Sequence, residues 1–160
     1  MNAMLTIREA VEADTALILE FIRKLADYER LSDAVAATEE SLRRSMFGER
    51  RHAEALLAEW DGRAAGMALF FHTYSTFRGR PDLWLEDLFV EPVHRGRGIG
   101  TALLARLARV ARERGCGAVE WNVLNWNEPA IGFYRRIGAT PVEGWTTYRL
   151  TGTALEELAR

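Results

Sequence analysis

The sequence predicts a mixed α/β fold in a single domain that covers residues 1–160. Segments in which apolar and polar residues alternate dominate the middle of the chain, as in half-buried β-strands. Amphipathic segments with a 3.6-residue period flank them, as in helices that cover a sheet. A strand–helix–strand unit over residues 83–124 predicts that two of the strands are parallel. The chain shows no internal repeat, low-complexity tract or linker-like segment that would divide it.

The first third of the chain is predicted to contain one strand and two helices. Leu5–Ala10 alternates apolar and polar residues and is predicted as a strand. Asp14 is expected to cap a helix over residues 15–30. The apolar face of that helix consists of Leu17, Ile18, Phe21, Ile22 and Leu25. Thr38 is expected to cap a second, shorter helix.

The middle of the chain is predicted to contain three strands followed by a helix. Residues 54–74 indicate two strands joined at Asp61-Gly62, a dipeptide typical of tight hairpin turns. Leu83–Val90 is predicted as the next strand. Thr101–Arg114 has the pattern of an amphipathic helix, and Gly115 is expected to end it.

The last third is predicted to complete the sheet. Ala118–Leu124 is predicted as a strand that lies parallel to the one before it. Residues 128–139 indicate a short helix with Pro129 in its first turn, where proline is well tolerated. Trp145–Leu150 alternates and is expected to be the closing strand.

The composition argues against several classes of protein: nucleic-acid binders, membrane proteins, and proteins that depend on disulfides or metal ions. A formal net charge of −2 argues against a general nucleic-acid or anionic-membrane binder. No apolar run approaches the roughly 20 residues that span a membrane, and Met1–Ala10 lacks the pattern of a signal peptide. Cys116 is the only cysteine, and the histidines lack zinc-binding spacing, so we expect no disulfide and no metal site; the histidines are His52, His72 and His94. We therefore expect a cytoplasmic protein without nucleic-acid or membrane partners.

Three glycines precede the predicted helix at Thr101, in the segment VHRGRGIGTALL. The first turn of a helix exposes unpaired backbone N–H groups at the positive end of the helix dipole, and both attract a phosphate. Gly96, Gly98 and Gly100 would let the backbone close around such an anion. Arg95 and Arg97 would add charges that pair with its oxygens. The pattern is that of a diphosphate site, although a glycine-rich turn without a ligand is the alternative.

Two other phosphate-binding motifs fit this segment less well. A P-loop needs a lysine followed by Ser or Thr at the helix start, and the segment contains no lysine. The dinucleotide motif G-x-G-x-x-G needs a third glycine at Thr101, and it normally follows the first strand of a chain. Neither motif is predicted here.

The segment resembles the acyl-CoA motif of the GNAT superfamily of N-acetyltransferases, Arg/Gln-x-x-Gly-x-Gly/Ala, at Arg95, Gly98 and Gly100. Four blocks in the same order resemble the spermidine/spermine N-acetyltransferase branch and its thialysine-acetylating relatives. They are LADYER, LEDLFVEPVHRGRGIGTALL, NWNEPAIGFYRRIGA and EGW, and the resemblance extends from about Ile7 to the end of the chain.

The resemblance implies the GNAT fold, a twisted, mostly antiparallel mixed sheet with a splayed parallel strand pair and flanking helices. In this family a bulge in the strand LEDLFV splays it from its neighbour, and acetyl-CoA enters the gap as the co-substrate. Backbone groups of Leu88, Phe89 and Val90 would then pair with the pantetheine arm. The resemblance assigns the other cofactor contacts to Arg95, Gly96, Arg97, Gly98, Ile99, Gly100, Thr101 and Asn127. From the residues alone, Asn127 could equally act as a helix cap.

The family resemblance implies two catalytic residues. Transfer to an amine requires a base, because an alkylammonium has a pKa near 10.4 and its protonated form cannot attack a thioester. Glu86 matches the base, acting directly or through water, and Tyr134 matches the acid that protonates the leaving thiolate. Glu86 and Asp87 are adjacent, so on a regular strand they would point to opposite faces. Without the family match, the two acids could be a solvated pair and Tyr134 a packing residue beside Phe133.

The substrate is expected to be the primary amine of a small cation: a diamine, a polyamine or a lysine-like amino acid. Residues that match the amine pocket of the family are Tyr28, Glu29, Glu86, Asp87 and Glu143, with Asp33 as a further acid. Arg30 departs from the acid-rich loop of the relatives and would repel a long polycation. This departure weakens the case for spermine more than the case for acetyl transfer.

Two alternative functions remain open, and the resemblance also implies a homodimer. A peptide or protein N-acetyltransferase would share the cofactor chemistry but needs an open groove. A non-catalytic acyl-CoA-binding module would need neither Glu86 nor Tyr134. The family commonly forms homodimers, and Trp145 and Tyr148 could serve the interface or pack in the core.

Overall fold

The computed structural model describes residues 4–160, and these divide into two compact units, residues 4–122 and 123–160. Residues 1–3, which belong to the segment considered for a signal peptide, lie outside the described residues. Each unit is described by itself. Among residues 4–160, no helix combines the length and apolar character required to cross a membrane.

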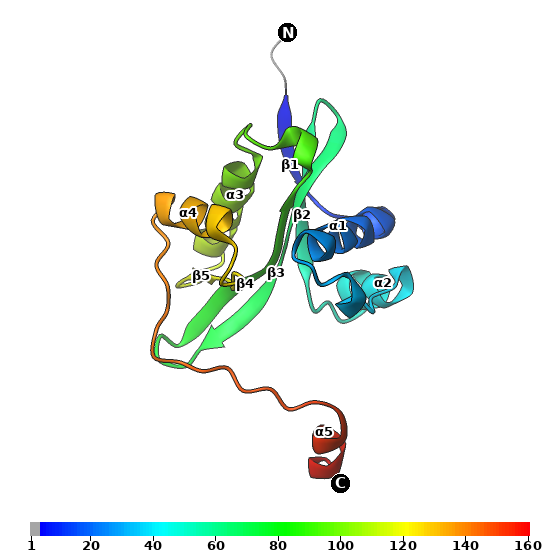
Figure 1. Ribbon diagram of the computed structural model, residues 1–160, viewed down its shortest axis with the longest axis vertical. Helices are drawn as coiled ribbons and strands as arrows, with labels where there is room; N and C mark the ends of the chain where they lie inside the picture. Colours follow the sequence, from blue (N-terminus) through cyan, green and yellow to red (C-terminus); the bar gives the residue numbers. More distant parts are fainter. Residues whose placement is uncertain (1–3) are drawn as a thin grey trace. The chain divides into compact units, whose positions relative to one another are not determined.

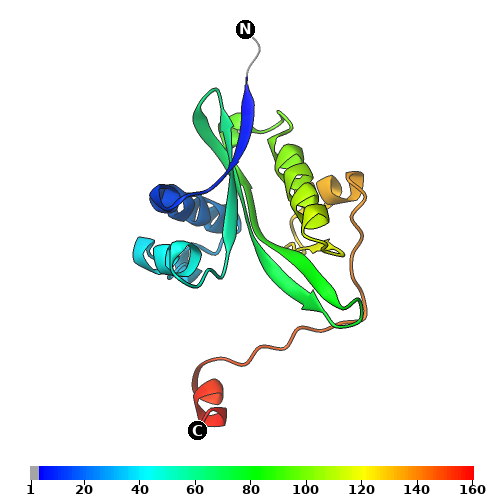
Figure 2. The ribbon, with the colours of Figure 1, turned by 180° about the vertical axis from the view of Figure 1, so that it is seen from behind.

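The first unit contains a five-stranded sheet in the order β1-β2-β3-β4-β5. The strands are β1 (Leu5–Glu9), β2 (Glu54–Trp60), β3 (Arg63–Ser75), β4 (Arg80–Val90) and β5 (Val119–Glu120). All neighbouring pairs are antiparallel except β4 and β5, which are parallel. The mixed sheet and its parallel pair confirm the predicted fold class, and Figures 1 and 2 show its twist.

Helices cover both faces of this sheet (Figures 1 and 2). One face carries α1 (Thr15–Tyr28) and α2 (Glu39–Phe47), and the other carries α3 (Ile99–Glu113). Short 3₁₀ turns, η1 (Glu12–Asp14), η2 (Ser32–Ala34) and η3 (Pro92–His94), complete the unit. The core on the α1 face contains Ile18, Phe21, Met46, Ala55, Leu57, Met67, Leu69 and Phe89.

The buried residues follow the two-residue period of the strands. Leu57 and Leu69 pack beneath α1, whereas their neighbours Leu56 and Phe70 point to the α3 face and are also buried. Both faces of β2 and β3 are therefore apolar, which explains their almost continuous hydrophobic sequence.

Most predicted turns and caps of the first unit are confirmed. Asp61 and Gly62 both have positive φ, +50° and +78°, which is the conformation that the Asp-Gly hairpin signal requires. The Thr38 hydroxyl accepts a hydrogen bond from the Ser41 amide at 3.1 Å and caps α2. Gly115 has a φ of +72° and ends α3 as expected.

The predicted capping role of Asp14 is wrong. Asp14 precedes α1, but its carboxylate makes no capping hydrogen bond to the helix. It accepts two hydrogen bonds from the Arg8 guanidinium, at 2.8 and 2.9 Å, and one from the Val11 amide at 2.8 Å. The guanidinium lowers the pKa of this carboxyl. Because Arg8 also pairs with Glu59 at 2.5 Å, Asp14 links the start of α1 to β1 and β2 instead.

The strand predicted over Ala118–Leu124 is much shorter in the structure. β5 contains only Val119 and Glu120, which pair with Leu83 and Trp84 of β4. The approach to β5 is fixed by the buried Asp82, whose carboxylate accepts a hydrogen bond from the Gly117 amide at 3.1 Å and pairs with Arg78. Beyond Trp84, no strand of residues 4–122 pairs with the edge of β4 that faces away from β3.

The second unit contains α4 (Glu128–Arg136) and α5 (Gly152–Leu158). Pro129 occupies the first turn of α4, as predicted. The strand predicted over Trp145–Leu150 is not formed, and this segment has no regular secondary structure. A strand requires a partner for its backbone hydrogen bonds, and residues 123–160 form no β-ladder. The sequence analysis also missed α5.

Candidate active site

The glycine turn between η3 and α3 is open. Gly96 and Gly98 have φ values of +77° and +79°, in the left-handed region where a side chain introduces strain. Within residues 4–160, and apart from the adjacent residues, no heavy atom lies within 4 Å of where a Cβ at either position would be. Gly98 is the N-cap of α3 and supplies no side chain to the first amides of the helix. The turn thus presents bare backbone N–H groups at the positive end of a 15-residue helix.

Side chains at the start of α3 leave these amides accessible. The Ile99 side chain is 1% exposed and anchors the helix in the core, so only its backbone faces the turn. Thr101 lies on the exposed side of the first turn. This arrangement suits a diphosphate, because oxyanions bind most strongly where unpaired amides and a helix dipole coincide.

The two arginines of the turn are held by aromatic rings. The Arg95 guanidinium lies 5.2 Å from the centroid of the Tyr28 ring, and Arg97 lies 4.9 Å from that of Trp60. Arg95 Nε donates a hydrogen bond to the Val90 carbonyl at 3.1 Å. Stacking occupies the faces of the guanidinium groups and leaves in-plane N–H groups for other partners.

The end of β4 provides a free backbone edge beside this turn. Leu88, Phe89 and Val90 pair with β3 on one side only, because β5 stops at the level of Trp84. An extended ligand can add to an unpaired edge of this kind, and the pantetheine contacts predicted for these residues stay a prediction. Phe89 directs its side chain into the core beneath α1, with its ring 5.3 Å from that of Phe21.

The predicted bulge in β4 falls at Glu86. Leu69 of β3 pairs with Asp87 and Phe70 pairs with Leu85, so Glu86 is the extra residue. The alternation that a regular strand would impose on Glu86 and Asp87 is therefore interrupted between them. Asp87 shares the α1 face with its partner Leu69, and the Glu86 carboxylate accepts a hydrogen bond from Trp84 Nε1 at 2.9 Å.

Glu86 and Asp87 form an acidic cluster with Glu29, which follows α1 directly. Burial raises the pKa of Asp87 to about 6, with further contributions from the negative charges of Glu86 and Glu29. Burial also raises the pKa of Glu29, and Glu86 adds to the effect. Glu29 and Asp87 are half-buried, Glu86 is exposed, and the three negative charges repel one another. Such a site favours a cation.

The structure brings most predicted residues of the first unit together. Tyr28, at the end of α1, contacts Arg95 of the glycine turn. Glu29, the next residue, lies close enough to Asp87 of the bulge for its charge to raise the pKa of Asp87. Asp33 lies exposed in η2. The sequence analysis missed the hydrogen bond from Trp84 to Glu86. Residues two positions apart on a strand share a face, and this spacing would have suggested the contact. It also missed the stacking of Arg95 and Arg97.

The remaining predicted residues belong to the second unit. Asn127 Oδ1 accepts a hydrogen bond from the Ala130 amide at 3.4 Å and caps α4, as one of the two predicted roles requires. Tyr134 lies on α4 with its ring 5.6 Å from that of Phe133. Glu143 is exposed in the segment between α4 and α5.

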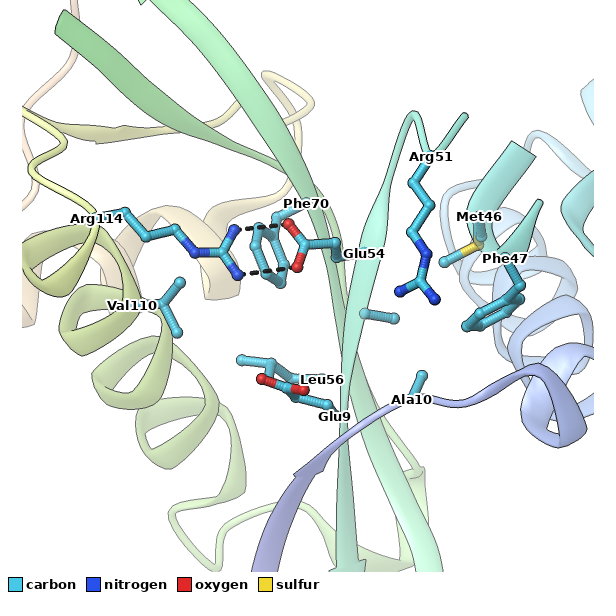
Figure 3. A pocket seen from close by; sticks show the side chains of 11 residues that line it. Glu9, Ala10, Met46, Phe47, Arg51, Glu54, Leu56, Phe70, Val110 and Arg114 are labelled. Carbon is cyan, nitrogen blue, oxygen red and sulfur yellow. Dashed lines mark hydrogen bonds and ion pairs between the residues drawn. The ribbon is translucent and has the colours of Figure 1, made fainter. Parts of the chain in front are cut away.

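A separate pocket lies where the ends of β1 and α2 meet the start of β2 (Figure 3). Arg114 and Glu54 form a two-bonded ion pair there, with N–O distances of 2.6 and 2.9 Å. The Arg114 guanidinium also lies 5.8 Å from the centroid of the Phe70 ring. The two charges of this ion pair neutralise each other, and no predicted site residue lines the pocket. The pocket is therefore best explained as part of the packing between α3 and the sheet.

The acidic cluster predicts an unusual effect of Asp87→Asn on stability. The Asp87 carboxyl has a pKa of 3.8 in the reference state and about 6 in the folded chain, so the folded state binds its proton more tightly. The free energy of unfolding therefore falls as the pH rises through this interval. We expect Asp87→Asn to stabilise the protein by about 1–3 kcal/mol at pH 7.5 and to remove this fall.

Urea denaturation between pH 4 and pH 8 measures the effect. Glu40→Gln is the control, because Glu40 is exposed in a surface ion pair with Arg44 and should change the free energy of unfolding very little. An Asp87→Asn protein that is less stable than the wild type at pH 7.5 would contradict the prediction.

Comparison with known proteins supports one assignment. The model of the Acetyltransferase (GNAT) family matches residues 19–139. The chain is 41% identical to a thialysine N-epsilon-acetyltransferase from Bos taurus over 98% of both chains. It is 40% identical to an L-ornithine N5-acetyltransferase from Arabidopsis thaliana over 59% of this chain and 41% of that one. Among solved structures, an integron cassette protein from the mobile metagenome of V. cholerae superposes with a TM-score of 0.80, at 27% identity over 98% of both chains.

Proposed function

Because this chain belongs to the GNAT family of acetyltransferases and uses acetyl-CoA as its co-substrate, we propose that it acetylates the primary amine of a small cation. The acidic cluster of Glu29, Glu86 and Asp87 carries this proposal. Two half-buried carboxylates and a third exposed one repel one another, and an ammonium group bound among them relieves this repulsion. The named relatives act on thialysine and L-ornithine, both small molecules with such a group.

Within this class, a lysine-like amino acid suits the site better than spermine. Arg30 follows Glu29 directly and adds positive charge next to the cluster. A long polycation would be repelled by this charge, whereas an amino acid also brings a carboxylate. Diamines, whose charge is smaller than that of spermine, stay within the proposed range.

We propose that acetyl-CoA lies along the open edge of β4 with its diphosphate at the glycine turn. The amides of residues 98–101 and the guanidinium groups of Arg95 and Arg97 would hold the diphosphate. Backbone groups of Leu88, Phe89 and Val90 would pair with the pantetheine arm, and Asn127 would contact the cofactor from the second unit. The family match over residues 19–139 includes parts of both units, which supports the proposal that the chain acts as a single catalytic domain.

The proposed reaction is direct attack of the amine on the thioester. Asp87 and Glu29 hold the ammonium, and Glu86 accepts one of its protons, directly or through water. The nitrogen lone pair then forms a bond to the acetyl carbon, and the carbon–sulfur bond breaks with its electron pair on sulfur. Tyr134 donates a proton to the thiolate, and the second proton that the nitrogen loses after attack returns to the tyrosinate, directly or through water. Holding the amine and the thioester together supplies much of the rate.

Thiol release from acetyl-CoA with a panel of acceptors tests this function. The panel contains thialysine, L-lysine, L-ornithine, a diamine, spermine and a peptide with a free N-terminus. We expect turnover with the small amines. Turnover of the peptide alone would favour a peptide N-acetyltransferase, and tight acetyl-CoA binding without transfer to any acceptor would overturn the proposal.

Glu86→Gln and Tyr134→Phe are each expected to lower kcat by about 10²-fold, because each removes a proton-transfer group but retains the shape of the side chain. Stopped-time assays with the best acceptor and saturating acetyl-CoA measure the change. Phe133→Leu, next to Tyr134 on α4, is the control for altered packing. Rates near that of the wild type in both variants would exclude the assigned roles.

The acidic limb of the profile of kcat/KM against pH is expected near pH 6, where Asp87 loses its proton in the free enzyme. Asp87→Asn should remove this limb and raise the KM for the amine. Glu29→Gln should move the limb to lower pH, because it removes one of the negative charges that raise the pKa of Asp87. An acidic limb that is the same in all three proteins would show that Asp87 does not control amine binding.

We further propose that the protein is a cytoplasmic homodimer. Trp145 and Tyr148 are 78% and 92% exposed, which is unusual for aromatic side chains that serve only a monomer. Light scattering should therefore give about twice the 18.1 kDa of one chain, and Trp145→Ser with Tyr148→Ser should reduce the mass to that of one chain. A wild-type mass of one chain at micromolar concentration would contradict the dimer.

A further inference from the structure

The stack of Arg95 on Tyr28 joins two parts of the site that the proposed function treats separately. Arg95 begins the glycine turn, where the diphosphate is proposed to bind. Tyr28 is the last residue of α1, and Glu29 of the acidic cluster follows it immediately. The 5.2 Å between the guanidinium carbon and the ring centroid thus connects the cofactor end of the site to the acceptor end.

The geometry lets Arg95 contact both partners at once. A guanidinium has five N–H donors in one plane, and stacking on a ring uses only its face. Nε donates to the Val90 carbonyl at 3.1 Å, and the terminal Nη1 and Nη2 groups have no hydrogen-bond partner among residues 4–160. These N–H groups can therefore bind phosphate oxygens while the face of the group stays on Tyr28.

A second contact fixes the same part of α1 to the end of β4. Lys24, one turn before Tyr28, pairs with Glu91 at 2.5 Å and with Glu20 at 3.0 Å. The end of α1 is therefore tied at Lys24 and stacked at Tyr28. The segment that continues from Tyr28 contains Arg30 in the left-handed region, with a φ of +62°, a conformation that non-glycine residues seldom adopt. A residue of this kind persists only where its neighbours hold it in place.

We infer that Arg95 and Tyr28 are a positioning pair that couples the two binding steps: a diphosphate on Arg95 orders the segment of Tyr28–Leu31 and so raises the affinity for the acceptor amine. Binding of the diphosphate fixes the guanidinium, and a fixed guanidinium fixes the ring stacked on it. Since binding couplings are reciprocal, the amine raises the affinity for the coenzyme by the same factor. The inference rests on the proposed cofactor site and extends the proposed function by a coupling between the two binding steps.

Hydrogen exchange with coenzyme A alone tests the coupling without an acceptor. The amides of Glu29, Arg30 and Leu31 donate to the carbonyls of Leu25, Asp27 and Ala26, at 2.9, 3.0 and 2.8 Å, and report order in this segment. Saturating coenzyme A should slow their exchange by about 5-fold or more in the wild type. Tyr28→Leu should abolish this slowing, and Tyr28→Phe, which retains the ring, should preserve it.

Trp60→Leu is the matched control. Arg97 is stacked on Trp60 as Arg95 is on Tyr28, but Trp60 ends β2 and leads to no acceptor residue. Trp60→Leu should therefore weaken coenzyme A binding and leave the slowing of exchange at residues 29–31 intact once coenzyme A saturates the protein.

Calorimetry extends the test to the acceptor. Thialysine is titrated into the protein with and without saturating coenzyme A, a pair that cannot react because no acetyl group is present. Its affinity should rise by about 5-fold or more with coenzyme A in the wild type and in Tyr28→Phe, and stay unchanged in Tyr28→Leu.

The outcomes separate this inference from the proposed function. A wild type that acetylates amines, with the same slowing of exchange in Tyr28→Leu, would overturn the coupling and leave the function intact. A wild type that acetylates nothing in the panel would overturn the function, and the exchange experiment would still report on Arg95 and Tyr28. Loss of the slowing in Trp60→Leu as well as in Tyr28→Leu would also overturn the coupling, because any loosened arginine would then have the same effect.

Discussion

The extra residue at Glu86 in β4 is the constraint on which the site depends. On a regular strand one of the two adjacent acids would face α3, and only one carboxylate would be available on the α1 side. The bulge interrupts this alternation, and the negative charges of Glu86 and Glu29 both act on Asp87. A bulge also bends and twists the strand that contains it, and β4 pairs with β5 only before that point. One inserted residue therefore accounts both for the acidic cluster and for the open edge beside the glycine turn.

The glycine turn solves a different problem, because a diphosphate site has to be open and still be rigid. Gly96 and Gly98 remove side chains from the space beside the helix start, and bare glycine alone would leave that backbone poorly fixed. The structure holds the turn through its neighbours instead. Ile99 is buried in the core, and the two arginines are stacked on Tyr28 and Trp60. Positive charge is thus placed before any ligand arrives, which reduces the ordering that binding requires.

The sequence was sufficient for features that depend on local patterns. The periodicity of β1 to β4 and of α1 to α4, the Asp61-Gly62 turn and the glycine turn before α3 follow from residues close in the chain, and these were predicted. Features that depend on distant partners were not. Asp14 has the composition of a helix cap, but Arg8 competes successfully for its carboxylate. Trp145–Leu150 alternates like a strand, yet a strand forms only with a neighbour. The stacks on Tyr28 and Trp60 join residues more than thirty positions apart, and spacing along the chain contains no sign of them.

The acidic cluster opposes folding, and the rest of the first unit compensates for it. Burial raises the pKa of Asp87 and of Glu29, and the negative charge of Glu86 adds to both shifts. Nearby, charges of opposite sign are paired: Arg8 with Asp14 and Glu59, and Lys24 with Glu91. No ion pair among residues 4–160 gives Asp87 a cation, although its carboxyl is half-buried. The lack of a cation beside Asp87 is explained if the substrate supplies it. The ammonium group of the substrate would then neutralise the acidic cluster only in the complex.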